Sequence, residues 1–154
     1  MSRFTEVLTV SPLDDGRTWF TRRDFGYDVH EEGSGDTIEV PITFMTDFAS
    51  IPRPLWVILP RWGRYGNAAV IHDYCYWTQK RSRRESDDVF LEAMGVLEVH
   101  PVKKYLMYWA VRIFGGFAWS GNQKKKKKSG DFRPLVLTKE VKSTEKPKEL
   151  GIKL

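Results

Sequence analysis

The sequence has a single cysteine, Cys75, in 154 residues. One cysteine cannot form an intramolecular disulfide, and a zinc site built from several thiolates is excluded as well. The chain must therefore be stabilised by a hydrophobic core, for which 41% hydrophobic and 14% aromatic residues are ample. This length suits one domain plus an extension.

Long hydrophobic runs are also missing. The longest, over residues 105–119, has about 15 residues, contains Arg112 and is shorter than the roughly 20 that span a bilayer. We interpret it as a buried helix, with a membrane-surface segment as the alternative. The first residues alternate between polar and apolar types, so we expect neither a secretory signal nor a transmembrane span.

The charge of the chain is unevenly distributed. Residues 1–120 hold 14 Lys and Arg and 16 Asp and Glu, whereas residues 121–154 hold 11 and 4. The formal net charge of +5 therefore arises at the end of the chain, which includes the lysine run Lys124–Lys128. Because like-charge runs repel and are solvated, we predict a globular domain over residues 1–120 and a disordered basic tail over residues 121–154.

Three short runs near the start of the chain predict strands: Phe4–Val10, Thr18–Thr21 and Thr37–Phe44. The apolar side chains of the third run should share one face: Ile38, Val40, Ile42 and Phe44. Pro41 has no backbone N–H to donate to a neighbouring strand, so this strand is expected at the edge of a sheet or at a bulge. We predict a small antiparallel sheet, followed by a Pro- and Trp-rich loop over residues 46–66 that packs onto the core.

Three helices should follow, at about residues 67–79, 82–95 and 101–114. Ser82 and Glu85 fit a capping box at the start of the second helix, and Gly95 fits a left-handed terminator at its end. The short link between the first two helices predicts an antiparallel hairpin. The predicted fold class is therefore α+β: an N-terminal antiparallel sheet, the loop, the helix hairpin, a third helix and the basic tail.

The first helix carries a histidine and a carboxylate at adjacent positions, His72 and Asp73. Such groups are costly to bury unless they pair, bind a metal or take part in catalysis. His72 and Tyr76 lie in one stripe of this helix, and Asp87 extends the apolar face of the second helix toward the core. We predict that Asp87 is buried and hydrogen-bonded to His72 or Tyr76.

A carboxylate that holds one imidazole nitrogen allows the other to activate water or a hydroxyl. The candidate catalytic residues are therefore His72, Asp87 and Tyr76. Asp73 would then be available to bind a hard cation together with Asp47 from the preceding loop. The alternative is that these residues form a polar network that only fixes the register of the two helices.

Several short motifs occur together between residues 36 and 119. They are Thr46-Asp47-Phe48-Ala49-Ser50-Ile51-Pro52-Arg53, Gly63-Arg64-Tyr65, His72-Asp73-Tyr74-Cys75-Tyr76, Ser86-Asp87-Asp88-Val89-Phe90 and the run from Met107 to Gly115. As a set they resemble a family of uncharacterised phage and prophage proteins, catalogued as a domain of unknown function. This resemblance implies a viral or prophage origin and a location in the host cytoplasm or the virion, and it supplies no activity.

The hairpin has a second pattern, His72-Asp73-x-x-Tyr76 followed by Asp87-x-x-Phe90. It is similar to the active-site helices of phospholipases A2, especially bacterial ones. The resemblance implies that His72 activates water, that Asp73 binds calcium, and that Tyr76 and Asp87 orient the histidine. The flanking disulfides and the glycine-rich calcium loop of that family are absent here, and Asp47 would take the place of the loop.

These observations favour a phage-encoded protein with a metal-dependent hydrolase site that acts on lipid or envelope esters, with calcium as the candidate cofactor. The alternative is a virion structural or assembly component of the tail or head–tail region that has no catalytic activity. The candidate partners are other virion proteins, a lipid or membrane surface, and nucleic acid bound through Lys124–Lys128.

Overall fold

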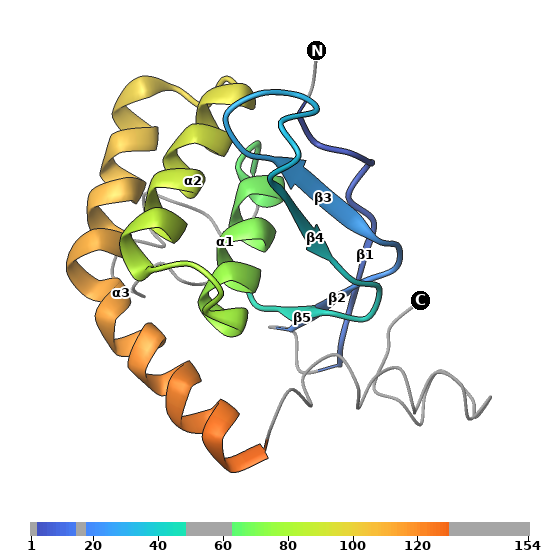
Figure 1. Ribbon diagram of the computed structural model, residues 1–154, viewed down its shortest axis with the longest axis vertical. Coiled ribbons are helices and arrows are strands. Elements are labelled where there is room, and N and C mark those ends of the chain that lie inside the picture. Colours follow the sequence, from blue (N-terminus) through green and yellow to red (C-terminus); the bar gives the residue numbers. More distant parts are fainter. Residues whose placement is uncertain (1–2, 15–17, 49–62, 130–154) are drawn as a thin grey trace.

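The computed structural model describes residues 3–14, 18–48 and 63–129. Within these ranges the chain forms five short strands followed by three helices, so the predicted α+β class is confirmed. Figure 1 shows the strands on one side of the molecule and the helices on the other. Most of the predicted Pro- and Trp-rich loop, residues 49–62, lies outside the described residues.

The strands form two small antiparallel sheets. One sheet has the order β1-β2-β5, with β1 at Val10–Pro12, β2 at Trp19–Thr21 and β5 at Met45–Thr46. The other pairs β3, Phe25–Asp28, with β4, Thr37–Val40. Sheets of this size are marginal by themselves, so they depend on packing against the helices for stability.

Strand β3 is missing from the sequence prediction, because Gly26 lies inside it and charged residues precede it. The glycine relieves a close approach: an added Cβ would lie 3.0 Å from Oγ1 of Thr5 and 3.1 Å from the carbonyl oxygen of Ile38. The strand predicted over Phe4–Val10 is wrong in extent. Phe4 forms an isolated bridge to Tyr27, and regular pairing starts at Val10.

The strand predicted over Thr37–Phe44 ends at Val40, one residue before Pro41. The expected edge position is confirmed, because the sheet of β4 has only two strands, but Pro41 itself lies just outside the strand. Phe44 is buried as predicted, but Ile42 is 48% exposed. The prediction of one continuous apolar face is wrong at Ile42 because the alternation ends with the strand.

Three helices follow in the described residues: α1 at Gly66–Thr78, α2 at Arg83–Val96 and α3 at Pro101–Ser129. The predicted antiparallel hairpin of α1 and α2 is confirmed, and so is the capping box of Ser82 and Glu85. Gly95 is not the left-handed terminator. It lies inside α2, and the residue with a positive φ after the helix is Glu98, at 54°.

Helix α3 continues to Ser129, well beyond the predicted end at Phe114. The tail predicted from residue 121 therefore begins inside the helix, and residues 130–154 lie outside the described residues. Lysine is a good helix former and is favourable in the last turn, which opposes the repulsion within the lysine run. In addition, Nζ of Lys126 donates a 2.9 Å hydrogen bond to the carbonyl of Thr78 at the end of α1. None of the described helices is both long and apolar enough to cross a membrane.

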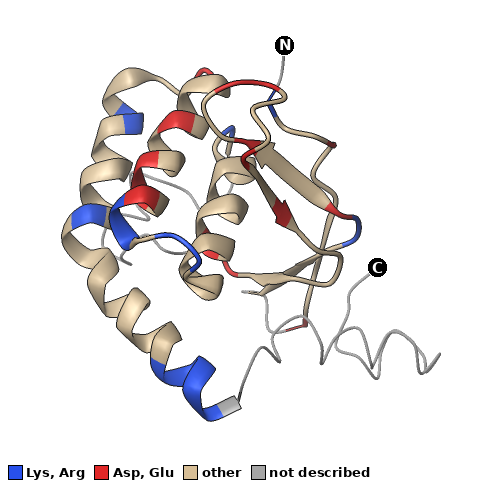
Figure 2. Cartoon of the chain, viewed as in Figure 1, with Lys and Arg blue, Asp and Glu red and all other residues tan. Residues whose placement is uncertain are grey.

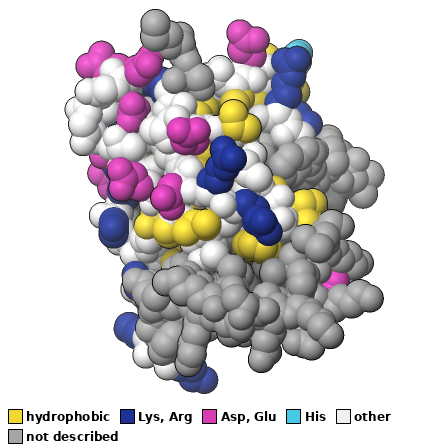
Figure 3. All heavy atoms as spheres, turned by 90° about the vertical axis from the view of Figure 1, so that its right-hand side faces the viewer, with side chains coloured by type: hydrophobic (Ala, Val, Ile, Leu, Met, Phe, Trp, Pro, Cys, Tyr) yellow, Lys and Arg dark blue, Asp and Glu magenta, His cyan; other side chains and the backbone are white. Residues whose placement is uncertain are grey.

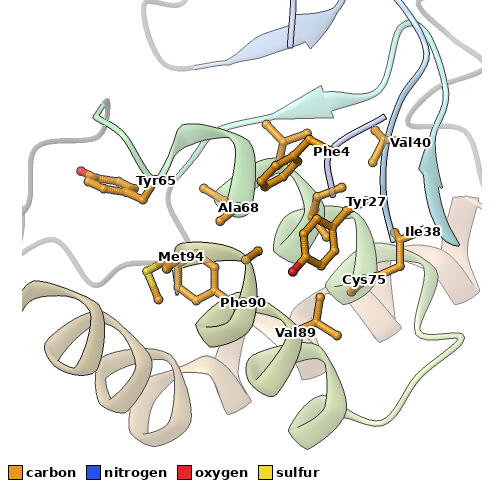
Figure 4. Packing of buried hydrophobic residues seen from close by; sticks show 14 of the residues in the cluster. Phe4, Tyr27, Ile38, Val40, Tyr65, Ala68, Cys75, Val89, Phe90 and Met94 are labelled. Atoms are coloured by element: carbon orange, nitrogen blue, oxygen red, sulfur yellow. The ribbon is translucent and has the colours of Figure 1, made fainter. Parts of the chain in front are cut away.

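The core lies between the strands and the helix hairpin (Figure 4). Tyr27 and Val40 from the strands and Phe90 and Met94 from α2 are at most 2% exposed. Cys75 of α1 belongs to the same cluster. Burial raises the pKa of the Cys75 thiol to about 12, so this thiol is not a nucleophile at neutral pH.

Candidate active site

The candidate site lies between α1 and α2. His72 and Tyr76 are one turn apart on α1, and both contact Asp87 on α2. Oδ1 of Asp87 lies 2.9 Å from Nε2 of His72 and accepts a 2.7 Å hydrogen bond from the Tyr76 hydroxyl. All three residues are at most 1% exposed. The predicted burial and hydrogen bonding of Asp87 are confirmed, with both donors in use.

A further donor to Asp87 comes from α3 and is absent from the sequence prediction. Nη1 of Arg112 lies 2.7 Å from Oδ2 of Asp87, and Nη1 of Arg83 lies 3.6 Å from the same oxygen. Both carboxylate oxygens are thus engaged by donors, as a buried carboxylate requires. The available signal was that Arg112 is the one cation in the apolar run 105–119, where an isolated charge needs a partner.

The protonation states of the network follow from these contacts. Burial raises the pKa of Asp87, but the hydrogen bonds from His72 and Tyr76 outweigh it and hold the pKa below its usual value. Burial and then the hydrogen bond to Asp87 raise the pKa of Tyr76. At neutral pH the site therefore contains an ionised Asp87 and a neutral Tyr76 that donates to it.

The contact with Asp87 also fixes the tautomer of His72. A carboxylate can only accept, so Nε2 of His72 must carry a hydrogen. In the neutral ring the lone pair is then on Nδ1, which forms no hydrogen bond among the described residues. The ring lies 4.1 Å from the Tyr76 ring and 4.7 Å from the Phe90 ring, measured between centroids. This packing orients the basic nitrogen.

Asp73, the predicted metal ligand, has a different environment. Its Oδ2 accepts a 2.5 Å hydrogen bond from the hydroxyl of Thr46 on β5, and the residue is 5% exposed. Asp47 follows Thr46 directly, but it is exposed whereas Thr46 is buried. Neighbouring residues of an extended segment point to opposite sides, so this arrangement does not favour a shared calcium ion. In the described ranges, no group of three or more His, Cys, Asp or Glu is arranged to hold a metal.

Gly115 of α3 is a second part of the site that sequence reasoning missed. A Cβ at this position would lie 2.4 Å from the hydroxyl oxygen of Tyr76. The absence of a side chain therefore lets Tyr76 extend toward Asp87 beside α3. The need for a small residue at this position follows from the packing of α3 on the hairpin. In the sequence, the only indication of it was a glycine within an apolar helix.

Residues 19–111 match a family described as "Protein of unknown function (DUF1353)". The chain belongs to this family. The DUF1353 match includes His72, Tyr76 and Asp87, and it stops one residue before Arg112. The predicted membership in a family of unknown function is thus confirmed.

One curated relative of this DUF1353 chain is the "Uncharacterized protein y4jT" of Sinorhizobium fredii (strain NBRC 101917 / NGR234), which is 36% identical over 94 residues. The aligned stretch covers 60% of this chain and 27% of the relative, so the chain spans about a quarter of the length of that protein. No solved structure matches the chain. The phage origin, the hydrolase activity and the virion role stay predictions.

Proposed function

We propose that this DUF1353 chain hydrolyses esters of lipid or envelope material, with His72 as the general base. The observation that supports this proposal is the buried contact between Asp87 and Nε2 of His72. It orients the imidazole, sets its tautomer and leaves Nδ1 as the basic nitrogen. His72, Tyr76 and Asp87 also match the residues that the resemblance to phospholipases A2 assigns to the histidine and its orienting groups.

In the proposed reaction, Nδ1 of His72 takes a proton from a water molecule while the water oxygen attacks the ester carbonyl. The ring becomes an imidazolium ion, which the Asp87 carboxylate stabilises through Nε2. When the tetrahedral intermediate collapses, the C–O bond to the alcohol breaks and His72 returns the proton to the leaving oxygen. The products are a carboxylic acid and an alcohol, and the protein is unchanged.

Arg112 and Tyr76 have positioning roles in this scheme. Arg112 binds the second oxygen of Asp87 and holds the carboxylate in place, and it adds to the stronger effect of His72 and Tyr76 in keeping the carboxylate ionised. Tyr76 donates to the same oxygen that contacts His72, so it fixes the direction of that oxygen. Neither side chain needs to touch the substrate.

The purified chain tests this proposal in a panel of soluble esters and phospholipid vesicles, with added calcium and with a chelator. His72→Ala should lower kcat/KM by about 10²–10⁴-fold, the usual loss on removing a general base. His100→Ala is the matched control, because His100 is exposed and lies outside the network. Dependence on calcium would support the predicted ligands Asp73 and Asp47, whereas equal rates with chelator would contradict them.

A second variant separates catalysis from folding. Asp87→Asn preserves the shape of the side chain but can donate to the imidazole, which favours the tautomer with its lone pair on Nε2. It should lose activity while circular dichroism still shows a folded protein. Equal turnover by wild type and His72→Ala, or no turnover by wild type on any ester, would favour the alternative that the network only fixes helix register.

A further inference from the structure

One face of α3 carries large apolar side chains that are exposed to solvent. Their exposed fractions run from 39% to 83%, and the residues are Val102, Tyr105, Leu106, Trp109, Ile113 and Phe117. They recur at steps of three or four, so they form one continuous row along the helix, which we call the apolar stripe. Contiguous exposed apolar surface on a folded domain commonly marks an interaction site.

Cationic side chains continue the apolar stripe. Lys124 and Lys127 lie on the same face, two to three turns beyond Phe117, and Lys128 lies beside them; all three lysines are exposed. The whole of α3 contains eight Lys and Arg and no Asp or Glu. Figure 2 shows the basic last turns of α3 projecting beyond the hairpin.

The sheet side of the molecule has the opposite charge. Residues 3–14 and 18–48 contain nine Asp and Glu, three Arg and no Lys. Figure 3 looks onto this side, where acidic side chains gather toward the upper left and a few basic ones lie beside them. This asymmetry would direct α3, and not the sheets, toward a negatively charged surface.

We propose that α3 lies along the surface of a bilayer that contains anionic phospholipids. The apolar stripe enters the boundary between headgroups and acyl chains, and Lys124, Lys127 and Lys128 contact the headgroups. A row that combines aromatic and aliphatic side chains with lysines is the chemistry of an interfacial helix. This inference is separate from the proposed hydrolysis, because binding is measured without turnover and should be unchanged in His72→Ala.

Charge and apolarity argue against three other occupants of the apolar stripe. A second copy paired along α3 would place two cationic helices together with no acidic side chain on either. Nucleic acid would neutralise the lysines but would leave Ile113 and Phe117 without apolar partners. The third occupant would be residues 130–154 of the same chain. They carry six Lys and Arg and four Asp and Glu, so this segment is net positive, as α3 is.

Co-sedimentation of the full chain with vesicles tests the proposal. Mixed phosphatidylglycerol and phosphatidylcholine vesicles should pellet the wild type, and pure phosphatidylcholine should pellet much less. Lys127→Gln combined with Lys128→Gln should weaken binding by about 25-fold, since each cation near an anionic surface contributes about fivefold. Arg22→Gln combined with Arg23→Gln removes the same charge from the sheet side and should leave binding unchanged.

A second pair of substitutions tests the apolar stripe. Ile113→Ser combined with Phe117→Ser should weaken vesicle binding by about tenfold or more, although the charge of the protein is unchanged. Val7→Ser combined with Ile42→Ser is its control, because these residues are also exposed but lie on the strand side. Circular dichroism checks that each variant is folded. The proposal is overturned if wild type does not bind the anionic vesicles, or if the control variants weaken binding as much as the α3 variants. The proposal is also overturned if the α3 substitutions leave vesicle binding unchanged but convert a dimer of the chain to monomers, or abolish its binding to DNA.

Discussion

Replacing Gly115 with alanine should break the contact between Tyr76 and Asp87. The new Cβ would lie 2.4 Å from the Tyr76 hydroxyl oxygen, where real Cβ atoms keep at least 3.0 Å, so the oxygen must move by 0.6 Å or more. The ring carbon that bears the hydroxyl would also be crowded, at 3.2 Å. The 2.7 Å hydrogen bond to Asp87 cannot keep its length and angle through such a shift.

The size of the effect follows from three terms. A buried hydroxyl that loses its partner costs about 1–3 kcal/mol, and overpacking costs about 1–3 kcal/mol. Exchange of glycine for alanine inside a helix offsets about 1 kcal/mol of this. The free energy of unfolding should therefore fall by about 1–5 kcal/mol, with a Tm decrease of about 2–4 °C for each kcal/mol.

Gly116→Ala is the matched control for this variant. A Cβ at residue 116 has no neighbouring atom within 4 Å, so the substitution should stabilise the helix by up to about 1 kcal/mol. Urea and thermal unfolding of both variants give the comparison. In a Tyr76→Phe background, which removes the hydroxyl oxygen, the cost of Gly115→Ala should shrink. The packing of Tyr76 against α3 is refuted if Gly115→Ala is as stable as Gly116→Ala.

Two further predictions concern Asp87. Because its folded pKa is depressed, its contribution to stability is complete above the unfolded pKa of about 3.9 and is lost as pH falls through the folded pKa. Urea unfolding between roughly pH 2 and 5 should therefore show a steeper loss of stability in wild type than in Asp87→Asn, and parallel curves would contradict this assignment. Arg112→Gln should lower the free energy of unfolding by about 1–3 kcal/mol, because Oδ2 of Asp87 loses its closest donor. Arg84→Gln is its control. The Arg84 side chain is 80% exposed and its Nε lies 3.8 Å from Oδ2 of Asp88, so this substitution should change the free energy of unfolding little. Equal effects of the two variants would count against the buried role of Arg112.

The hairpin and its polar contact could be predicted from sequence because both depend on local rules. Helical spacing puts His72 and Tyr76 on one face, and the capping box fixes the residue at which α2 begins. Once that starting point is known, the turn of the helix also sets the direction of Asp87. A buried carboxylate must then find donors across the hairpin, and two were within reach.

The contribution of α3 could not be predicted in the same way. The roles of Arg112 and Gly115 depend on how α3 is rotated and shifted along the hairpin, which no local pattern in the sequence specifies. The run of lysines was also misjudged, because repulsion within Lys124–Lys128 is a local argument, whereas the contact of Lys126 with the end of α1 is a tertiary one. Strand β3 was missed for a related reason: Gly26 weakens the strand pattern, and its close approach to Thr5 is a tertiary contact.

The way in which α3 is attached bears on how it could bind a surface. Arg112 fixes the middle of the helix to Asp87, and Lys126 fixes its end to Thr78. These two contacts are about 21 Å apart along the axis, and the whole apolar stripe lies before or between them. Many interfacial helices fold only when they bind, and the ordering of the chain then weakens the observed affinity. Here the helix is already formed and attached to the hairpin, so binding requires little further ordering. The circular dichroism spectrum should therefore remain nearly unchanged when anionic vesicles are added, and a large gain in helical signal on binding would contradict a pre-formed surface.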